Sequence, residues 1–197
     1  MNTEDENSHN HGLLGTSLTR RPRGLTFGYE KEKLIMRIAN EKDLPAIVAI
    51  YNTTVPTRQS TADTEEVTVA SRMEWFRQHT PGKRPLLVHE QDGRIVAWVS
   101  FQSFYGRPAY DHTAEVSIYI SPECRGQGLG RKLLADALGL TLEMRIKTVV
   151  GFVFSHNEPS IKLLKSFGFE DWGKLPKVAE MDGKEYSLSI LGKRVNP

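Results

Sequence analysis

Apolar residues occur in short runs from residue 36 onward, and the spacing within each run predicts its secondary structure. Strands are predicted where the runs are rich in β-branched or alternating apolar residues, over residues 36–39, 85–89, 94–101, 113–120, 147–154 and 186–191. Asp92-Gly93 separates two of these runs and predicts a β-hairpin.

Other segments carry apolar residues three or four positions apart, as amphipathic helices do. Asp43 followed by Pro45 predicts the start of a helix, with Asp43 as its N-cap. Further helices are predicted over residues 69–79, from Leu129 onward, and from Asn157 to Phe167. A run of strands followed by strand–helix–strand–helix–strand predicts a mixed α/β or α+β sheet with helices packed on it.

The composition is that of a folded domain with a polar extension. Of 197 residues, 39% are apolar and 25% are charged, which are ordinary values for a globular protein. Residues 1–35 hold few apolar side chains and equal numbers of basic and acidic ones. We therefore expect a disordered N-terminal extension over residues 1–35 and one domain over residues 36–197.

Charge and cysteine content narrow the partners and the compartment. The 26 basic and 24 acidic residues give a net charge of +2, which argues against a broad nucleic-acid-binding surface. Cys124 is the only cysteine and cannot form an internal disulfide, in keeping with a reducing, cytoplasmic location. No apolar run approaches the roughly 18–20 residues that span a bilayer. We therefore expect no membrane span. The six histidines are scattered along the chain, so we also expect no metal site.

The strongest chemical signal is the glycine loop, which we define as residues 125–131, Arg-Gly-Gln-Gly-Leu-Gly-Arg. Glycines at a helix start let a phosphate approach the free backbone N–H groups there. Two common phosphate motifs do not fit, because the dinucleotide fingerprint needs glycine where Arg131 stands and the P-loop needs Ser or Thr where Leu133 stands. The loop fits (Arg/Gln)-x-x-Gly-x-(Gly/Ala), and a plain glycine-rich turn with a helix cap is the alternative.

Three stretches together resemble the GCN5-related N-acetyltransferases. The glycine loop is similar to the family's pyrophosphate-binding motif, and residues 157–169 resemble its Asn-containing helix, ending in Gly-Phe, beside the pantetheine arm. Residues 107–120, Arg-Pro-Ala-Tyr-Asp-His-Thr-Ala-Glu-Val-Ser-Ile-Tyr-Ile, resemble the phosphinothricin and methionine sulfoximine acetyltransferases. The resemblance implies a mixed, mostly antiparallel sheet flanked by helices, acetyl-CoA as cosubstrate, a small-molecule primary amine as acceptor, and a homodimer.

The resemblance also implies which residues hold acetyl-CoA. Main-chain groups of the glycine loop would bind the pyrophosphate, and backbone amides at the end of the preceding strand would face the cofactor and the developing oxyanion. The implied cofactor residues are Ile118, Tyr119, Ile120, Arg125, Gly126, Gln127, Gly128, Leu129, Gly130, Arg131, Asn157 and Ser160.

For catalysis, the resemblance implies Glu115 as the base that takes a proton from the acceptor amine. An amine with a pKa near 10.4 is neutral about once in 2,500 at pH 7, so a positioned base offsets part of that cost. The family's usual acid for the leaving thiolate stands seven residues after the Asn, where this chain has Leu164. Tyr119, His156 and solvent are the alternatives, and Tyr119 is included with Glu115 as a candidate catalytic residue.

Acceptor recognition is expected in the loop before the strand 113–120. The implied substrate residues are Phe104, Tyr105, Arg107 and Tyr110, of which Arg107 is suited to pairing with a carboxylate. Trp75 and Phe76 are expected in the core. Two other functions stay open, namely acetylation of a protein or peptide N-terminus on the same scaffold and a non-catalytic acyl-CoA-binding sensor.

Overall fold

The computed structural model describes residues 35–197, so the expected N-terminal extension lies outside the described residues. No helix in the described range is long and apolar enough to cross a membrane. Its strands and helices in chain order are β1 (Met36–Ile38), α1 (Leu44–Asn52), α2 (Val69–Arg77), β2 (Leu86–Gln91), β3 (Arg94–Ser103), β4 (Thr113–Ile120), α3 (Leu129–Gly139), β5 (Thr148–Phe154), α4 (Glu158–Ser166), β6 (Glu170–Met181) and β7 (Lys184–Arg194).

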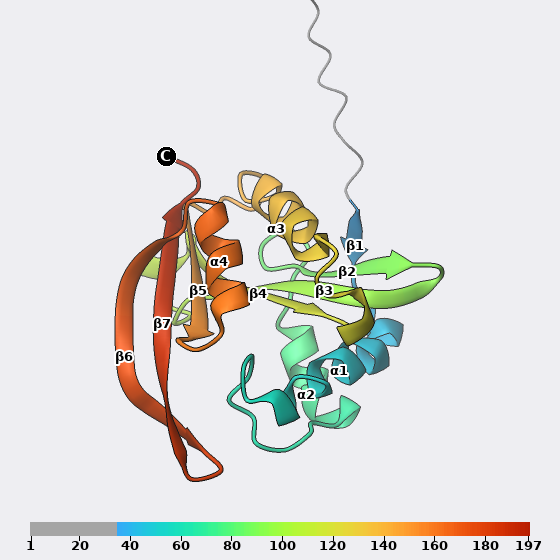
Figure 1. Cartoon of the computed structure of the whole chain (residues 1–197). Helices are drawn as coiled ribbons and strands as arrows, with labels where there is room; N and C mark the ends of the chain where they lie inside the picture. Colours follow the sequence, from blue (N-terminus) through green and yellow to red (C-terminus); the bar gives the residue numbers. More distant parts are fainter. Residues whose placement is uncertain (1–34) are drawn as a thin grey trace, which may run out of the picture. The chain divides into compact units, whose positions relative to one another are not determined.

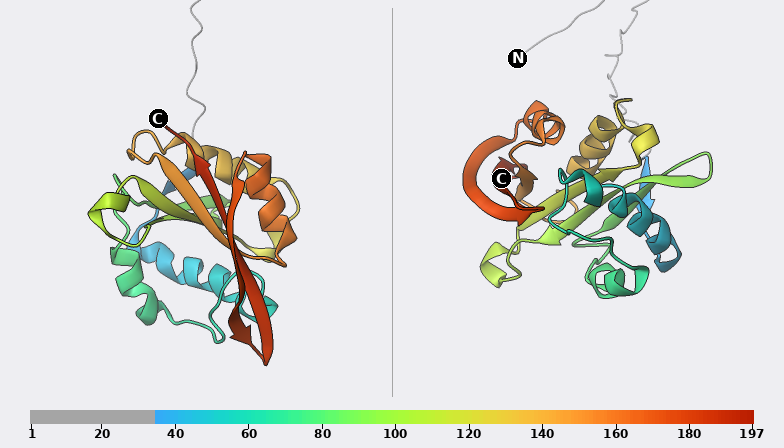
Figure 2. Two further views of the ribbon diagram at one scale, coloured as in Figure 1. Left: turned by 90° about the vertical axis from the view of Figure 1, so that its left-hand side faces the viewer. Right: turned by 60° about the horizontal axis from the view of Figure 1, so that its bottom comes forward.

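These strands form one sheet in the order β1-β2-β3-β4-β5-β7-β6. Neighbouring strands are antiparallel except β4 and β5, which are parallel. Helices α1 and α2 pack on one face, and α3 and α4 pack on the other (Figure 2). The predicted mixed, mostly antiparallel sheet flanked by helices is confirmed.

Strand β3 is buried on both faces, which explains its unbroken apolar run. Ala97 and Val99 belong to the core cluster beneath α3 and α4. Trp98 points the other way, into the cluster with α1, and its Nε1 donates to the carbonyl of Ile47 at 3.1 Å. The two faces of β3 therefore join both helical layers to the sheet.

Strands β4 and β5 run side by side for only three residues. Thr113–Glu115 of β4 pairs with Thr148–Val150 of β5, and farther along β5 pairs with β7 alone. Among residues 35–197, the second half of β4 has no strand neighbour on that side (Figure 1). This separation leaves backbone groups of β4 available beside the start of α3.

The apolar pattern does not predict β6. Its residues are exposed almost throughout, and its register with β7 shifts between Asp171 and Gly173 and again between Leu175 and Ala179. A strand at the edge of a sheet without a buried face has no reason to alternate, and Pro176 further obscures the pattern.

The N-cap prediction for Asp43 is wrong in its chemistry, although α1 begins at Leu44 as expected. The Asp43 side chain does not cap α1. Its carboxylate accepts from the N–H of Asn40 at 2.7 Å and pairs with Arg37 at 2.7 Å. The hydrogen bond from Arg37 lowers the pKa of Asp43, so this side chain closes the short turn before the helix.

Candidate active site

The glycine loop connects the end of β4 to the start of α3. Gly126 and Gly128 have φ angles of 73° and 79°, in the left-handed region that glycine adopts without strain. Gly128 stands at the N-cap of α3 and has no side chain to cap it. The N–H of Arg131 donates back to the carbonyl of Gly128 at 3.1 Å. The N–H groups of Leu129 and Gly130 have no acceptor among the described residues, so they are left for an external one, as a phosphate site at a helix start requires.

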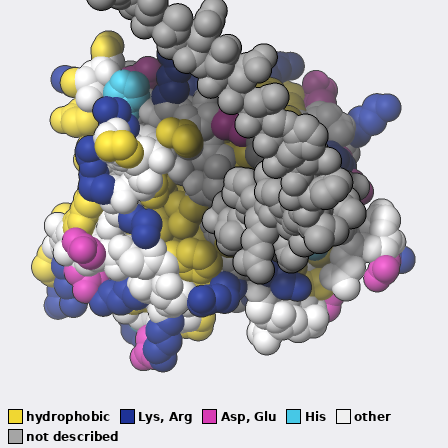
Figure 3. All heavy atoms as spheres, turned by 90° about the horizontal axis from the view of Figure 1, so that it is seen from above, with side chains coloured by type: hydrophobic (Ala, Val, Ile, Leu, Met, Phe, Trp, Pro, Cys, Tyr) yellow, Lys and Arg dark blue, Asp and Glu magenta, His cyan; other side chains and the backbone are white. Residues whose placement is uncertain are grey.

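Two arginines brace this loop. Arg125 donates from Nε to the carbonyl of Ile120 at 2.8 Å, and Arg131 donates from Nη1 to Ser166 Oγ at 3.2 Å. Both guanidinium groups keep positive charge beside the loop while fixing it to β4 and α4. The face of the molecule seen in Figure 3 carries Lys and Arg side chains among apolar and uncharged ones.

The open side of β4 exposes alternate backbone amides. Ser121 N–H donates to the carbonyl of Val96 at 2.8 Å, so the odd-numbered residues of β4 direct their backbone groups toward β3. By the alternation of a strand, the N–H groups of Ile118 and Ile120 face the opening beside β5, and that of Tyr119 faces β3. Of the three predicted backbone donors, Ile118 and Ile120 are thus the ones directed into the opening.

The face of the sheet covered by α1 and α2 holds a cavity of about 190 Å³, which we call the acceptor cavity. Glu115, Ser117 and Tyr119 line it together, because alternate residues of a strand share a face. Its remaining wall is formed by Ile47, Val48, Tyr51, Val67, Arg72, Trp75, Trp98, Ser100 and Gln102. Trp75, expected in the core, packs against the core and also lines this cavity.

Glu115 is the carboxylate that the structure offers as a base. Burial raises its pKa, and no group within residues 35–197 forms a hydrogen bond or ion pair with it. A carboxylate without a protein partner is free to accept a proton from a bound molecule, and a raised pKa makes it a stronger proton acceptor. The geometry is consistent with the role that the sequence predicts for Glu115.

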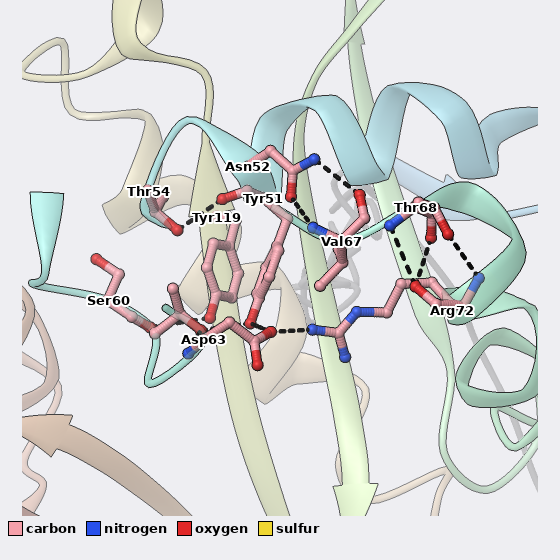
Figure 4. A network of polar contacts seen from close by, with 11 residues as sticks. Tyr51, Asn52, Thr54, Ser60, Asp63, Val67, Thr68, Arg72 and Tyr119 are labelled. Carbon is pink, nitrogen blue, oxygen red and sulfur yellow. Dashed lines mark hydrogen bonds and ion pairs between the residues drawn. The ribbon is translucent and has the colours of Figure 1, made fainter. Parts of the chain in front are cut away.

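Tyr119 is fixed inside the wall of the acceptor cavity. Its ring stacks on Trp98 with centroids 4.3 Å apart, and its hydroxyl donates to the carbonyl of Ser60 at 3.0 Å (Figure 4). Burial raises the pKa of this phenol. The proton of Tyr119 is therefore held by Ser60, and this hydrogen bond would have to open before Tyr119 could protonate a thiolate.

Asn157 connects the start of α4 to residues 58–63, which we call the 58–63 loop. Its Oδ1 accepts from the N–H of Ser160 at 3.2 Å, so it caps α4. Its Nδ2 donates to the carbonyl of Gln59 at 3.0 Å. Because Tyr119 is bonded to the same loop, the helix expected beside the cofactor and the acceptor cavity share one short connecting segment.

The predicted substrate residues lie together but outside the acceptor cavity. Phe104, Arg107 and Tyr110 line an open depression of about 370 Å³ in the connection between β3 and β4. Tyr105 packs edge-on against Phe104, with ring centroids 4.4 Å apart. Phe104 also stacks on Phe152 of β5 at 6.3 Å, which keeps this aromatic group beside the sheet.

Leu164 occupies the position where the family commonly has an acid, and the structure makes it a core residue. Its side chain is 6% exposed. It covers Gly151 so closely that a Cβ there would lie 2.9 Å from the Leu164 Cδ1. The close fit explains why this position tolerates an apolar side chain, and it leaves thiolate protonation to another group.

A glycine loop at a helix start, a strand edge with free amides and a half-buried carboxylate on that strand are the features of an acyltransferase that uses a coenzyme A thioester. The model of the acetyltransferase (GNAT) family matches residues 45–169. The chain is 49% identical over 163 residues, 83% of its length and 100% of the relative's, to the "Putative phosphinothricin acetyltransferase YwnH" of Bacillus subtilis. It is 28% identical over 158 residues, 80% of its length and 92% of the relative's, to the L-methionine sulfoximine/L-methionine sulfone acetyltransferase of Salmonella typhimurium.

A solved structure of yncA from Salmonella typhimurium with its cofactor acetyl-CoA matches with a TM-score of 0.76 and 28% identity, over 82% of this chain and 93% of that one. The chain belongs to the GNAT family of acetyltransferases and is an acetyl-CoA-dependent N-acetyltransferase of the phosphinothricin and methionine sulfoximine type. The family resemblance seen in the sequence is confirmed.

The sequence did not point to several residues that shape the acceptor cavity. Arg72 and Trp98 are two of these and line it, and neither of them stands in a recognised motif. A signal was present for Arg72, because it lies three residues before Trp75 on α2 and three residues bring two side chains to one face of a helix.

Proposed function

We propose that this enzyme acetylates the primary amine of a small amino acid or amino acid analogue, with phosphinothricin and methionine sulfoximine as the first candidates. The observation that carries the proposal is the acceptor cavity with the unpartnered carboxylate of Glu115 in it. Its volume of about 190 Å³ is below the roughly 300–1,000 Å³ of pockets for drug-sized ligands. This size supports a small molecule as the acceptor.

The chemistry follows from the groups of this chain. An ammonium ion cannot attack a thioester, so Glu115 takes the proton of the acceptor amine. The backbone N–H groups of Ile118 and Ile120 face the opening where negative charge develops on the carbonyl oxygen, and they stabilise it. The glycine loop and the start of α3 hold the pyrophosphate. Acetyl-CoA supplies the activated acyl group and a thiolate leaving group.

The source of the proton for the thiolate follows by elimination among the predicted alternatives. Leu164 carries no acidic proton, and Tyr119 is bonded to Ser60. His156 directs Nε2 at the carbonyl of Arg58, 2.9 Å away. We infer that solvent or the proton released by the amine reaches the thiolate.

Other parts of the proposal concern assembly and compartment. We propose a cytoplasmic homodimer that uses no metal and binds no nucleic acid. A single cysteine fits a reducing compartment, and a net charge of +2 fits the absence of a nucleic-acid surface. Exposed aromatic side chains, including Tyr105 at 75% exposure, support a subunit contact. Light scattering at micromolar concentration tests the dimer, and a monomer mass would contradict it.

The experiment for the function is a panel of primary amines scored by release of free CoA. Phosphinothricin, methionine sulfoximine, proteinogenic amino acids and short peptides are offered at equal concentration. Turnover of amino acids with no turnover of peptides supports the proposal. Turnover of peptides alone supports the N-terminal acetyltransferase, and acetyl-CoA binding without any product supports the sensor.

A further inference from the structure

The acceptor cavity contains a charged side chain that the proposed reaction does not use. Arg72 of α2 lines this cavity and places its guanidinium carbon 4.6 Å from the centre of the Tyr51 ring. The same carbon lies 5.8 Å from the Trp75 ring. The side chain is 25% exposed, so the cation is mostly enclosed by aromatic walls.

The protein satisfies only a small part of this guanidinium. Arg72 Nη2 donates to Oδ2 of Asp63 at 2.5 Å. Within residues 35–197, Nε and Nη1 donate to no protein acceptor. A guanidinium has five N–H donors, and donors that leave water without finding an acceptor cost free energy. The unused N–H donors of Arg72 are available to hydrogen-bond with oxygen atoms of a bound molecule.

Arg72 is nevertheless held in place. The Asp63 oxygen that it contacts also accepts from the Tyr51 hydroxyl at 2.6 Å (Figure 4). The N–H of Asp63 donates to Thr61 Oγ1 at 3.1 Å. Stacking on Tyr51 and the hydrogen bond to Asp63 together orient the planar group before any ligand arrives, which favours recognition of a carboxylate.

The charged groups of the acceptor cavity indicate which chemical groups its ligand carries. Glu115 offers a carboxylate without a partner, and Arg72 offers unused N–H donors in the same cavity. A molecule with an ammonium group and a carboxylate satisfies both, whereas a simple alkylamine satisfies only Glu115. Arg107, the residue that the sequence predicts for carboxylate binding, lines the separate depression and not this cavity.

We propose that Arg72 is the specificity-determining residue that binds the carboxylate of the acceptor amino acid. The inference rests on the proposed function, since it concerns the acceptor of that reaction. It assigns the α2 side of the cavity to the carboxylate and the β4 side to the amine.

The test compares two acceptors in four proteins. The acceptors are L-methionine sulfoximine and the corresponding amine that lacks the carboxylate. The proteins are the wild type, Arg72→Gln, Arg72→Lys and, as the matched control, Arg107→Gln. For each pair, kcat/KM is measured by CoA release, and acceptor binding to the CoA-loaded protein is measured by calorimetry.

We expect Arg72→Gln to lower kcat/KM for the amino acid by about tenfold to a hundredfold, the effect of losing a hydrogen-bonded ion pair. The carboxylate-free amine should change by less than about twofold. Arg72→Lys should show an intermediate loss of kcat/KM for the amino acid, because lysine keeps the positive charge but lacks the planar guanidinium that donates two parallel hydrogen bonds. Arg107→Gln should leave the ratio of the two acceptors unchanged.

Equal losses for both acceptors would overturn the inference, and so would a collapse of selectivity in Arg107→Gln alone. If the wild type acetylates neither acceptor, the proposed function fails, and the role of Arg72 in binding is then tested by calorimetry alone. The inference is supported if the wild type binds the amino acid and Arg72→Gln does not. It is contradicted if the wild type does not bind the amino acid. If Arg72→Gln does not fold, as seen by thermal melting, Arg72→Lys carries the same comparison.

Discussion

The Nδ2 atom of Asn157 and the carbonyl oxygen of Gln59 lie 3.0 Å apart, although 98 residues separate them in the chain. This bond ties the first turn of α4, beside the expected cofactor site, to the 58–63 loop that also holds Tyr119. A side chain expected to act on the cofactor is thus engaged with the acceptor side of the enzyme.

We expect Asn157→Asp to separate the two roles of this side chain. Aspartate keeps the oxygen that caps α4 but loses the N–H donors that reach Gln59. KM for the acceptor should rise several-fold, while KM for acetyl-CoA changes little. Asn157→Ala removes the cap as well and should lower the free energy of unfolding by a further ~1 kcal/mol. A change in KM for acetyl-CoA alone would show that Asn157 acts on the cofactor.

Replacing Leu164 by alanine should affect stability more than chemistry. The side chain is 6% exposed and covers Gly151, and its loss leaves a cavity beside β5. Removal of a buried leucine side chain costs about 2–5 kcal/mol. Chemical denaturation measures this loss. The pH profile of kcat should keep its shape, because leucine exchanges no proton, and a changed profile would indicate that residue 164 takes part in proton transfer.

How far the sequence predicts the fold depends on which elements have a buried face. Strand 113–120 alternates in contact with two helical layers, and its bounds agree with the structure. β6 has no buried face, so its apolar residues carry no period, and only Asp182-Gly183, the same turn signal as Asp92-Gly93, marks its hairpin with β7.

The candidate site likewise combines residues that stand in local sequence motifs with residues that are brought together only by tertiary contacts. The glycine loop and Glu115 stand in contiguous motifs, which a sequence displays. The contact of Arg72 with Asp63 and the bond of Tyr119 to Ser60 depend on how α2 and the 58–63 loop return to the sheet. Tertiary packing of this kind leaves no local pattern, so the spacing of Arg72 from Trp75 places the two side chains on one face of α2 but does not reveal the contact with Asp63.

Gly128→Val should abolish tight binding of acetyl-CoA. The substitution places a branched side chain where the phosphate would meet the backbone, at a φ of 79°. Gly183→Val is the matched control, because Gly183 has a φ of 70° and open space around it, and lies in the β6–β7 turn. Both variants share the strain of roughly 1–2 kcal/mol. Calorimetry should show weakened CoA binding in Gly128→Val alone, and equal affinities would remove the glycine loop from the cofactor site.

Glu115→Gln is the sharpest test of the mechanism, because it keeps size and removes basicity. Acetyl transfer should fall by roughly 10²–10⁴-fold, with the affinity for acetyl-CoA nearly unchanged. The wild type should lose kcat/KM as the pH falls through the raised pKa of Glu115, since only the carboxylate accepts a proton. In the variant this acid limb should disappear, and the residual rate should climb with pH as more of the amine becomes neutral. Wild-type turnover in the variant would leave Glu115 without a catalytic role.

The same substitution should make the protein more stable at neutral pH. Glu115 binds its proton more tightly in the folded than in the unfolded protein, because burial raises its pKa. Folding stability therefore decreases as the pH rises from the ordinary glutamate value through the raised one. Glutamine carries no charge and escapes this penalty. The melting temperature of Glu115→Gln should exceed that of the wild type at pH 7–8, and the difference should vanish below about pH 4. A difference that does not change with pH would show that the carboxylate of Glu115 is well solvated and is not the tuned base that the reaction requires.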